Sequence, residues 1–494
     1  MNQPLIRYIG LISISTGVMI GPLDTSVNIA FPHIVADFDQ PMKMTQWVVI
    51  CYVLTYASLM LVFGKLGDLY GQRRIFFLGL MASIFALALI SLADSFNALL
   101  FFRFLQGVGI GLVTSVAPAM MISLYPEEKR SHAVGLFTLF FALGGLLGPI
   151  IGGVLIDLFD WRAVFWFRIP IAFLSLILIV ATPKQPIESK RTNFDWIGAV
   201  SLVFFLVACL LTINQLHNIG GQEAWLVLLY ASIAIIFIYI FVWQEQRFED
   251  PILNLTMFRN INFVVVNIAS CLLYSATFSV ILIIPFFLYK SANISTNEAG
   301  FILSIGFIGT SIAGLISGKL IGKFKSNHMS FSGILITGIG LCLIGYADPS
   351  VNLYWMIPAI FLQGIGTGLF QSSYLFTVTG LLPVSERGVS GSIVMLTRTI
   401  GVVSVVSLLT LGFAWLNKIN HERVEIIPKD TKSNPIDALK VSKELYQEGV
   451  KIVIGPVFNE STKYLDDLED ITFISFIFGL FIKFLYFEVL SSFS

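Results

Sequence analysis

The sequence predicts an all-α polytopic membrane protein: two six-helix bundles, two inserted spans, and a small extramembrane α/β-like segment near the C-terminus. Of its 494 residues, 56% are hydrophobic and 12% are charged, and the net charge is zero. Ordinary globular domains carry about 25% charged residues. A soluble chain of this size could not bury so much apolar surface, which argues against a soluble enzyme. The balanced charge gives no basic patch for a nucleic acid.

Thirteen runs are apolar over the roughly 20 residues that a helix needs to cross a bilayer. A fourteenth, residues 471–490, is weaker because it contains Lys483 and Glu488. The first run lacks a small-residue cleavage site, so we expect it to remain as a span. The thirteen runs cover residues 8–32, 45–63, 75–93, 97–124, 131–156, 163–181, 195–214, 224–243, 261–288, 298–321, 331–347, 353–381 and 389–415.

The charges of the short loops predict that the N-terminus lies in the cytoplasm. Cytoplasmic loops of membrane proteins carry an excess of Lys and Arg. With this orientation the inside loops hold Arg7, Lys65, Arg73, Arg74, Lys129, Arg130, Lys184, Lys190, Arg191, Arg247, Arg259, Lys319, Lys323, Lys325 and Arg387. The outside loops hold only Lys43, Arg162, Arg168 and Lys290. One missed span would disturb this alternation, so it also supports the span count.

An internal repeat predicts duplicated halves. The segment FLQGVGIGL at 104–112 returns as FLQGIGTGL at 361–369, identical at seven of nine positions. Gly64-Lys65-Leu66 returns as Gly318-Lys319-Leu320, at nearly the same offset. Parallel halves of this kind are typical of transporters, with the substrate site between them at the midplane. The expected units are a first bundle (1–187), two inserted spans (188–250), a second bundle (251–416), an extracytoplasmic loop or fused fragment (417–470) and a possible last span (471–494).

Three charges of the first half are absent from the second. Asp24, Asp68 and Arg103 align with uncharged residues, whereas Gln106 recurs as Gln363. A charge inside the bilayer costs at least about 2.5–3.5 kcal/mol on insertion scales. Charges that the second half does without are therefore candidates for function. The candidates for lining the substrate cavity are Asn28, Gln106, Gln363 and Arg398.

The loop after the second run, GKLGDLYGQRR at 64–74, resembles the signature loop of the major facilitator superfamily. The resemblance implies that Asp68 faces a helix N-terminus in the other half, that the two arginines lie at lipid phosphates, and that the loop latches the outward-facing state. Leu69 and Gln72 stand where basic residues are common in that family. The alternative is an ordinary positive-inside turn. The expected latch residues are Gly64, Asp68, Gly71, Arg73 and Arg74.

Two further segments are similar to motifs of the same superfamily. The run RFLQG, beginning at Arg103, resembles the fourth-span motif, whose arginine participates in proton transfer. A structural arginine that extends toward the interface is the alternative. The glycine-rich fifth run resembles the antiporter motif, although simple helix packing would also use glycine there. The residues of this expected motif are Gly144, Gly148, Pro149, Gly152 and Gly153.

Residues 5–415 as a whole resemble the 14-span drug:proton antiporter subfamily. The resemblance rests on LDTSVNIAFP at 23–32, Trp161-Arg162 and TRTIG at 397–401. It implies exchange, in which Asp24 takes up a proton in the outward-facing state while substrate leaves, and reverses this in the inward-facing state. Asn28 is expected one helical turn from Asp24 on the same face. The alternative for Asp24 is a structural partner of Arg103.

The resemblance implies a secondary transporter of the inner (cytoplasmic) membrane that exports amphiphilic small molecules by proton antiport. We expect a monomer without metal or cofactor, whose partners are substrate, protons and lipid. Arg168 at the outer start of the sixth span, and the lack of acids deep in spans 9–13, favour neutral or anionic substrates. The alternatives are an exporter of a specific metabolite, such as a siderophore or lipid, and a non-transporting sensor.

Residues 416–475 show a different pattern. Two short apolar strands, two helices and a third strand are indicated in the order βαβαβ. This order resembles a fragment of a type I periplasmic binding-protein lobe. A gene fusion, a truncation that replaced the last span and a coincidentally patterned loop are the alternatives.

Overall fold

The computed structural model describes residues 3–40, 44–125, 130–182, 193–215, 224–292, 296–321, 323–345, 355–381 and 386–419. Within these ranges every regular element is a helix, which confirms the predicted all-α class. The α/β-like pattern expected for 416–475 lies outside the described residues except for its first four positions. The weak fourteenth run, 471–490, lies wholly outside them.

The helices follow the thirteen predicted runs closely. Twelve of the described helical segments are long and apolar enough to cross a membrane. The remaining run, 353–381, forms α14, which has 26 residues but is less apolar. The elements are α1 (Gln3–Met19), η1 (Pro22–Ser26), α2 (Val27–Asp37), α3 (Thr45–Tyr70), α4 (Gln72–Ser91), α5 (Phe96–Ser123), α6 (Arg130–Leu158), α7 (Ala163–Trp166), α8 (Arg168–Ala181), α9 (Trp196–Gln215), α10 (Ala224–Glu245), η5 (Leu255–Arg259), α11 (Ile261–Ala292), α12 (Thr296–Leu320), α13 (Ser326–Gly345), α14 (Met356–Leu381) and α15 (Arg387–Ile419).

Local signals explain several of these boundaries. The Ser95 side chain accepts a hydrogen bond from the backbone N–H of Ala98 and so caps the start of α5. Gly71 separates α3 from α4 with a φ of 96°, a conformation that favours glycine because it has no Cβ. Proline and two hydroxyl side chains mark η1, which divides the first predicted span into α1 and α2.

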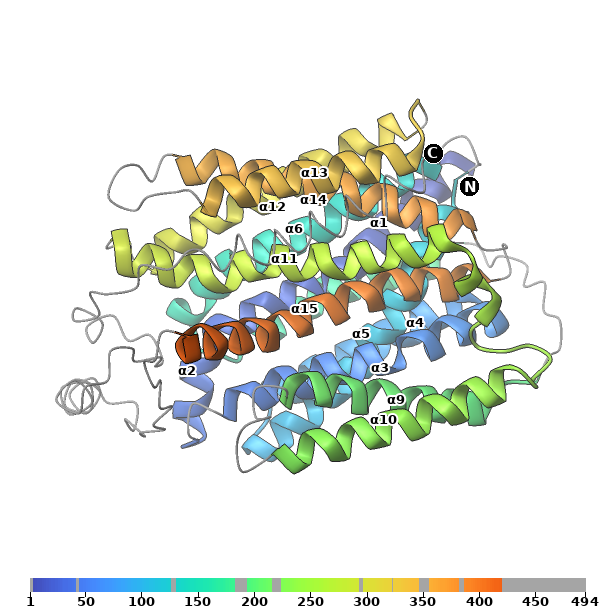
Figure 1. The fold of residues 1–494 in the computed structure, drawn as a ribbon, viewed down its shortest axis with the longest axis horizontal. Coiled ribbons are helices and arrows are strands. Elements are labelled where there is room, and N and C mark those ends of the chain that lie inside the picture. Colours follow the sequence, from blue (N-terminus) through green and yellow to red (C-terminus); the bar gives the residue numbers. More distant parts are fainter. Residues whose placement is uncertain are drawn as a thin grey trace.

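The helices lie side by side along the long axis of the molecule (Figure 1). The inserted pair α9 and α10 lies at the flank of the bundle, where α9 contacts both α3 and α15, while α10 packs mainly on α9. Leu228, Ile235 and Tyr239 of α10 are exposed apolar side chains. Such a helix is suited to face lipid rather than the interior of the protein.

The two halves meet through a symmetric pair of glycine contacts. Gly64 of α3 lies against Ser392 of α15, and its repeat partner Gly318 of α12 lies against Gly135 of α6. Gly135 and Ser392 are themselves related by the repeat offset of 257. A Cβ on Gly135 would lie only 3.0 Å from the Cα of Gly318. The end of the bundle where these contacts occur, with the end of α3 and the start of α15, is called the Gly64 end below.

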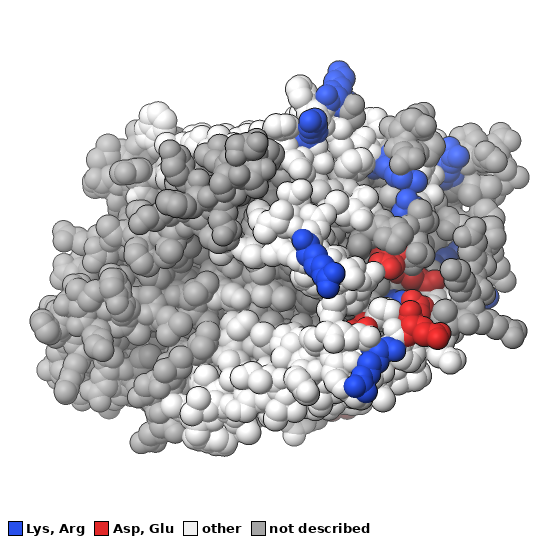
Figure 2. Space-filling model, turned by 45° about the vertical axis from the view of Figure 1, so that its right-hand side comes forward, with Lys and Arg blue, Asp and Glu red and all other residues white. Residues whose placement is uncertain are grey.

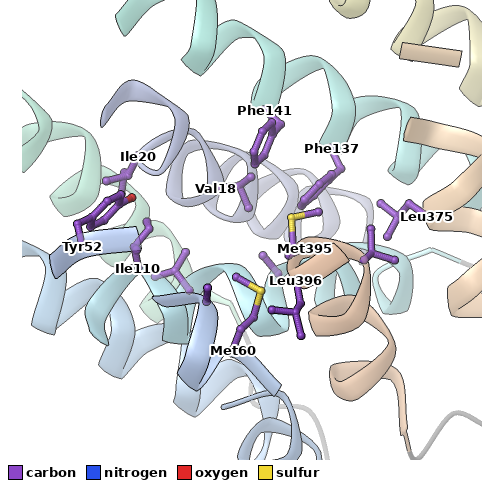
Figure 3. Close-up of a cluster of buried hydrophobic side chains, with 14 of the residues drawn as sticks. Val18, Ile20, Tyr52, Met60, Ile110, Phe137, Phe141, Leu375, Met395 and Leu396 are labelled. Carbon is purple, nitrogen blue, oxygen red and sulfur yellow. The ribbon is translucent and has the colours of Figure 1, made fainter. Parts of the chain in front are cut away.

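Apolar side chains fill much of the space between the halves. Figure 3 shows Phe137 and Phe141 of α6 on one side, with Met395 and Leu396 of α15 near them and Met60 of α3 below. Burial of such apolar side chains stabilises the packing of one half on the other, and this packing needs no charged group. The few charged groups within the bundle are therefore the places to look for chemistry.

Candidate functional site

Asp24 lies at a break in the first span. It belongs to η1, a 3-10 turn between α1 and α2. Thr25 donates its hydroxyl hydrogen to the Pro22 carbonyl, and Ser26 donates to the Leu23 carbonyl. These bonds satisfy backbone oxygens locally, so the turn persists in place of a continuous helix.

This break corrects one expectation about the first span. A continuous helix would have placed Asn28 on the same face as Asp24. In the structure Asn28 is the second residue of α2, after the turn; it is exposed and makes none of the hydrogen bonds that surround Asp24. The periodicity argument failed because it assumed 100° per residue through a 3-10 segment.

Arg103 of α5 holds the Asp24 carboxylate with two hydrogen bonds. Nη1 lies 2.8 Å from Oδ1 and Nη2 lies 2.8 Å from Oδ2. Gln106, one turn further along α5, donates to Asp24 Oδ1 at 3.1 Å and accepts from Arg103 Nη1 at 2.7 Å. Arg103 also donates Nε to the Val48 carbonyl of α3. A bidentate pair of this kind fixes both position and orientation.

Arg168 is a second cation on the same carboxylate. Its Nη1 lies 2.6 Å from Asp24 Oδ1, its Nε donates to the Val164 carbonyl, and its side chain is fully buried. The sequence counted Arg168 with the outside charges and placed it at the outer start of the sixth span, and in the structure it is the first residue of α8, within that span. The short α7 precedes α8, so Arg168 begins α8 inside the bundle and reaches Asp24 from there. With Asp24 ionised, the cluster of Asp24, Arg103 and Arg168 carries one net positive charge.

Aromatic rings surround the two guanidinium groups. The Cζ atom of Arg103 lies 4.4 Å from the Tyr52 ring centroid. The Cζ atom of Arg168 lies 5.1 Å from the Phe165 ring centroid, and Arg103 approaches the same ring at 5.7 Å. Rings stabilise cations through their quadrupole and keep water away from the ion pair. The Asp24 cluster is therefore strongly stabilised in this conformation.

The turn that carries Asp24 packs against one face of α6. A Cβ added at Gly148 would meet the Thr25 side chain, and one at Gly152 would lie 2.7 Å from the Ser26 Cβ. Gly144, one turn earlier, packs equally closely on the end of α1. Gly153 differs, because a Cβ there would meet nothing within 4 Å. Three glycines of the expected antiporter motif thus position η1, and the fourth does not.

Asp68 lies at the Gly64 end and contacts the other half. Its Oδ1 accepts from the Gly388 N–H at 2.8 Å, and its Oδ2 accepts from the Val389 N–H at 3.1 Å. These are the unpaired N–H groups of the first turn of α15, where the helix dipole favours a negative charge. Gln72 also donates to Asp68 Oδ1 at 3.1 Å. The carboxylate thereby joins the end of α3 to the start of α15.

Arg73 contacts the end of a neighbouring helix, which the sequence did not indicate. This side chain donates to the Ile179 carbonyl at 2.8 Å and to the Val180 carbonyl at 3.2 Å. Both carbonyls belong to the last turn of α8, which lacks helical partners for them. Arg73 therefore satisfies the carbonyl groups at the end of α8 within the protein. Arg74 is exposed.

An ion pair that the sequence did not indicate links the Gly64 end to the inserted helices. Lys65 Nζ lies 2.7 Å from an oxygen of Asp250, which follows α10. Glu386, just before α15, lies outside the spans; burial raises the pKa of its carboxyl, and nearby Lys65 opposes that rise. Figure 2 shows acidic side chains gathered on the right-hand side of the view, with basic side chains around them.

The equivalent place in the second half is neutral. Gln363, the repeat partner of Gln106, donates to the Thr367 hydroxyl at 3.2 Å. That hydroxyl lies 3.4 Å from the hydroxyl of Thr277, the repeat partner of Asp24. Arg398 of α15 joins neither cluster and stacks on Phe141 instead. Of the cavity candidates, only Gln106 contacts Asp24.

Comparisons with known proteins agree with this architecture. A family model described as Major Facilitator Superfamily matches residues 12–403. The chain is 31% identical over 398 residues to Multidrug resistance protein 3 of Bacillus subtilis (strain 168), covering 79% of this chain and 77% of the relative. It is 29% identical over 400 residues to Riboflavin transporter RibZ of Clostridioides difficile (strain 630), covering 80% and 85%.

A solved structure shares the fold. The human organic anion transporter MFSD10 (TETRAN) superposes with a TM-score of 0.62 and 14% sequence identity, covering 83% of this chain and 93% of that one. At this identity the likeness concerns the fold alone.

Proposed function

The chain belongs to the Major Facilitator Superfamily, and from this premise we propose that it exports amphiphilic small molecules across the cytoplasmic membrane by proton antiport. The observation that carries the proposal is the Asp24 carboxylate, held between Arg103 and Arg168 at a break in the first span. A buried carboxylate loses its charge when it takes up a proton, and the break in the first span allows the segment that carries Asp24 to move. We also propose the 14-span antiporter subfamily, a monomer, and a cytoplasmic N-terminus.

The proposed cycle uses the contacts of the Asp24 cluster. With Asp24 ionised, both arginines bind it and η1 stays in the glycine face of α6. A proton on Asp24 removes the negative charge, so the two guanidinium groups repel each other without a shared partner. The cluster then rearranges, and the Gly64 end opens as the contact of Asp68 with α15 is lost. Each charge moved across 100 mV supplies about 2.3 kcal/mol to drive this exchange.

A second candidate is the transport of one specific metabolite. The relative named as a riboflavin transporter supports it, because it matches this chain over 80% of its length. A specific carrier would move one compound and be inhibited by its analogues, whereas a multidrug exporter would move several unrelated compounds.

The test is proton-driven flux in inverted vesicles, with several dyes and anionic amphiphiles. Wild type is compared with Asp24→Asn and with the control Asp37→Asn, since Asp37 also pairs with an arginine but lies half-exposed at the end of α2. We expect a pH gradient to drive flux in wild type and in the control, and Asp24→Asn to bind substrate without pH-driven flux. Equal pH-driven flux in all three would refute coupling at Asp24. No flux of any compound by wild type would favour a non-transporting sensor.

A further inference from the structure

Arg398 is a cation on the seam between the two halves. It lies eleven residues after the first residue of α15, which places it about 16 Å along that helix and near the middle of the bundle. Its Cζ atom lies 4.0 Å from the ring centroid of Phe141 in the first half and 5.3 Å from that of Tyr274 in the second half. Both halves therefore contribute to its surroundings.

This guanidinium has no counter-ion in the described part of the chain. The ion pairs found there use Arg103, Arg168 and other cations but not Arg398. Its Nε atom is buried and makes no hydrogen bond to any described residue. Stacking on rings offsets only part of the cost of removing such a charge from water. A group of opposite charge brought by a ligand would offset the rest.

The charges near Asp24 and Arg398 also favour a negatively charged ligand. The guanidinium groups of Arg103 and Arg168 share the Asp24 carboxylate, and Arg398 adds a third positive charge that pairs with no described carboxylate. Arg103 and Arg168 are almost completely buried, whereas the Arg398 side chain keeps partial exposure. An interior with this excess of positive charge repels cationic substrates and attracts anionic ones.

We propose that Arg398 binds the anionic group of the substrate, so that the transported molecules are amphiphilic anions with an apolar or aromatic body. This inference rests on the proposed transport function and assigns its substrate class. The rings of Phe141 and Tyr274, both buried in this conformation, flank Arg398 and give the site the aromatic lining that suits an aromatic body. The apolar side chains next to them, Phe137 and Met395, extend that lining along the seam (Figure 3).

The binding experiment uses the full chain in detergent with two probes that share one ring system, 1-pyrenebutyrate and 1-pyrenemethylammonium. Energy transfer from the 8 tryptophans to pyrene reports binding. We expect wild type to prefer the anion and Arg398→Gln to bind it at least tenfold more weakly, or about 1.4 kcal/mol. Arg398→Lys keeps the charge without the planar stack and should fall between them. Arg247→Gln is the matched control, because Arg247 stacks on Trp243 at 4.1 Å but is exposed.

The outcomes separate this inference from the proposed transport function. Anion binding that depends on Arg398, in a chain without pH-driven flux, supports the anion site and refutes the antiporter. Flux of ethidium driven by pH, together with binding of the cationic probe equal to or tighter than the anionic probe, refutes the anion site and leaves the antiporter standing. The preference of wild type between the two probes decides the question even if Arg398→Gln fails to fold.

Discussion

Replacing Asp68 with asparagine tests whether its contact with α15 keeps the Gly64 end closed. Asp68 accepts two backbone hydrogen bonds, from Gly388 and Val389. Asparagine keeps one acceptor oxygen, so the variant loses one charge-assisted bond and the attraction of the carboxylate to the helix dipole. A hydrogen bond to a charged group contributes about 1.5–3 kcal/mol. The population of the closed Gly64 end should therefore fall roughly 10- to 150-fold relative to the open one.

The measurement is the distance between spin labels at the Gly64 end. Labels at Arg74→Cys and Lys325→Cys lie on exposed positions in different halves, in a chain whose four native cysteines are replaced. We expect a single short distance in the parent chain and a second, longer population in Asp68→Asn. The control is Asp157→Asn, an exposed carboxylate near the other end of α6. An unchanged distance distribution in Asp68→Asn would show that the contact does not hold the halves together.

Three further changes follow from the described contacts. Gly148→Ala should lower the free energy of unfolding by about 1–3 kcal/mol, because its Cβ meets the turn that carries Asp24. Its control, Gly153→Ala, should leave the midpoint of thermal unfolding unchanged, because a Cβ there meets nothing. Arg168→Gln should lower the midpoint of thermal unfolding less than Asp24→Asn does, because the Asp24 carboxylate still pairs with Arg103. An equal fall in the two variants would contradict this. Lys65→Met removes a cation near Glu386, so the pKa of that carboxyl, already raised by burial, should rise further in a carbon-13 titration, and a fall would refute the assignment.

The sequence predicted the spans well because the bilayer imposes one strong requirement. Each span must be apolar for about 20 residues and satisfy its own backbone, so composition alone places it. The helices accordingly begin and end within a few residues of the predicted runs. The repeat also predicted which glycines correspond, although only the structure shows that Gly64 and Gly318 meet the opposite halves.

The site was predicted only in part because its geometry depends on breaks in helices. Asp24 and Arg103 could be chosen from the cost of burying charge, and the structure joins them. Arg168 could not be assigned to Asp24, because its contact spans 144 positions and depends on the turn before α8. Asn28 was misplaced for the same kind of reason, since η1 interrupts the helical period.

The two halves meet along two seams, one between α3 and α15 and one between α6 and α12, and α9 packs on only the first of them. Alpha-9 packs on α3 and α15 together, so it covers the seam that they form. The other seam, between α6 and α12, is contacted by α14, as the seam of α3 and α15 is contacted by α5, but neither α9 nor α10 packs on it in a comparable way. The outer edge of the seam between α3 and α15 is therefore covered by an inserted helix, whereas the edge of the seam between α6 and α12 is not. The two inserted spans thus give the two seams different surroundings, although the glycine contacts within the seams are related by the repeat.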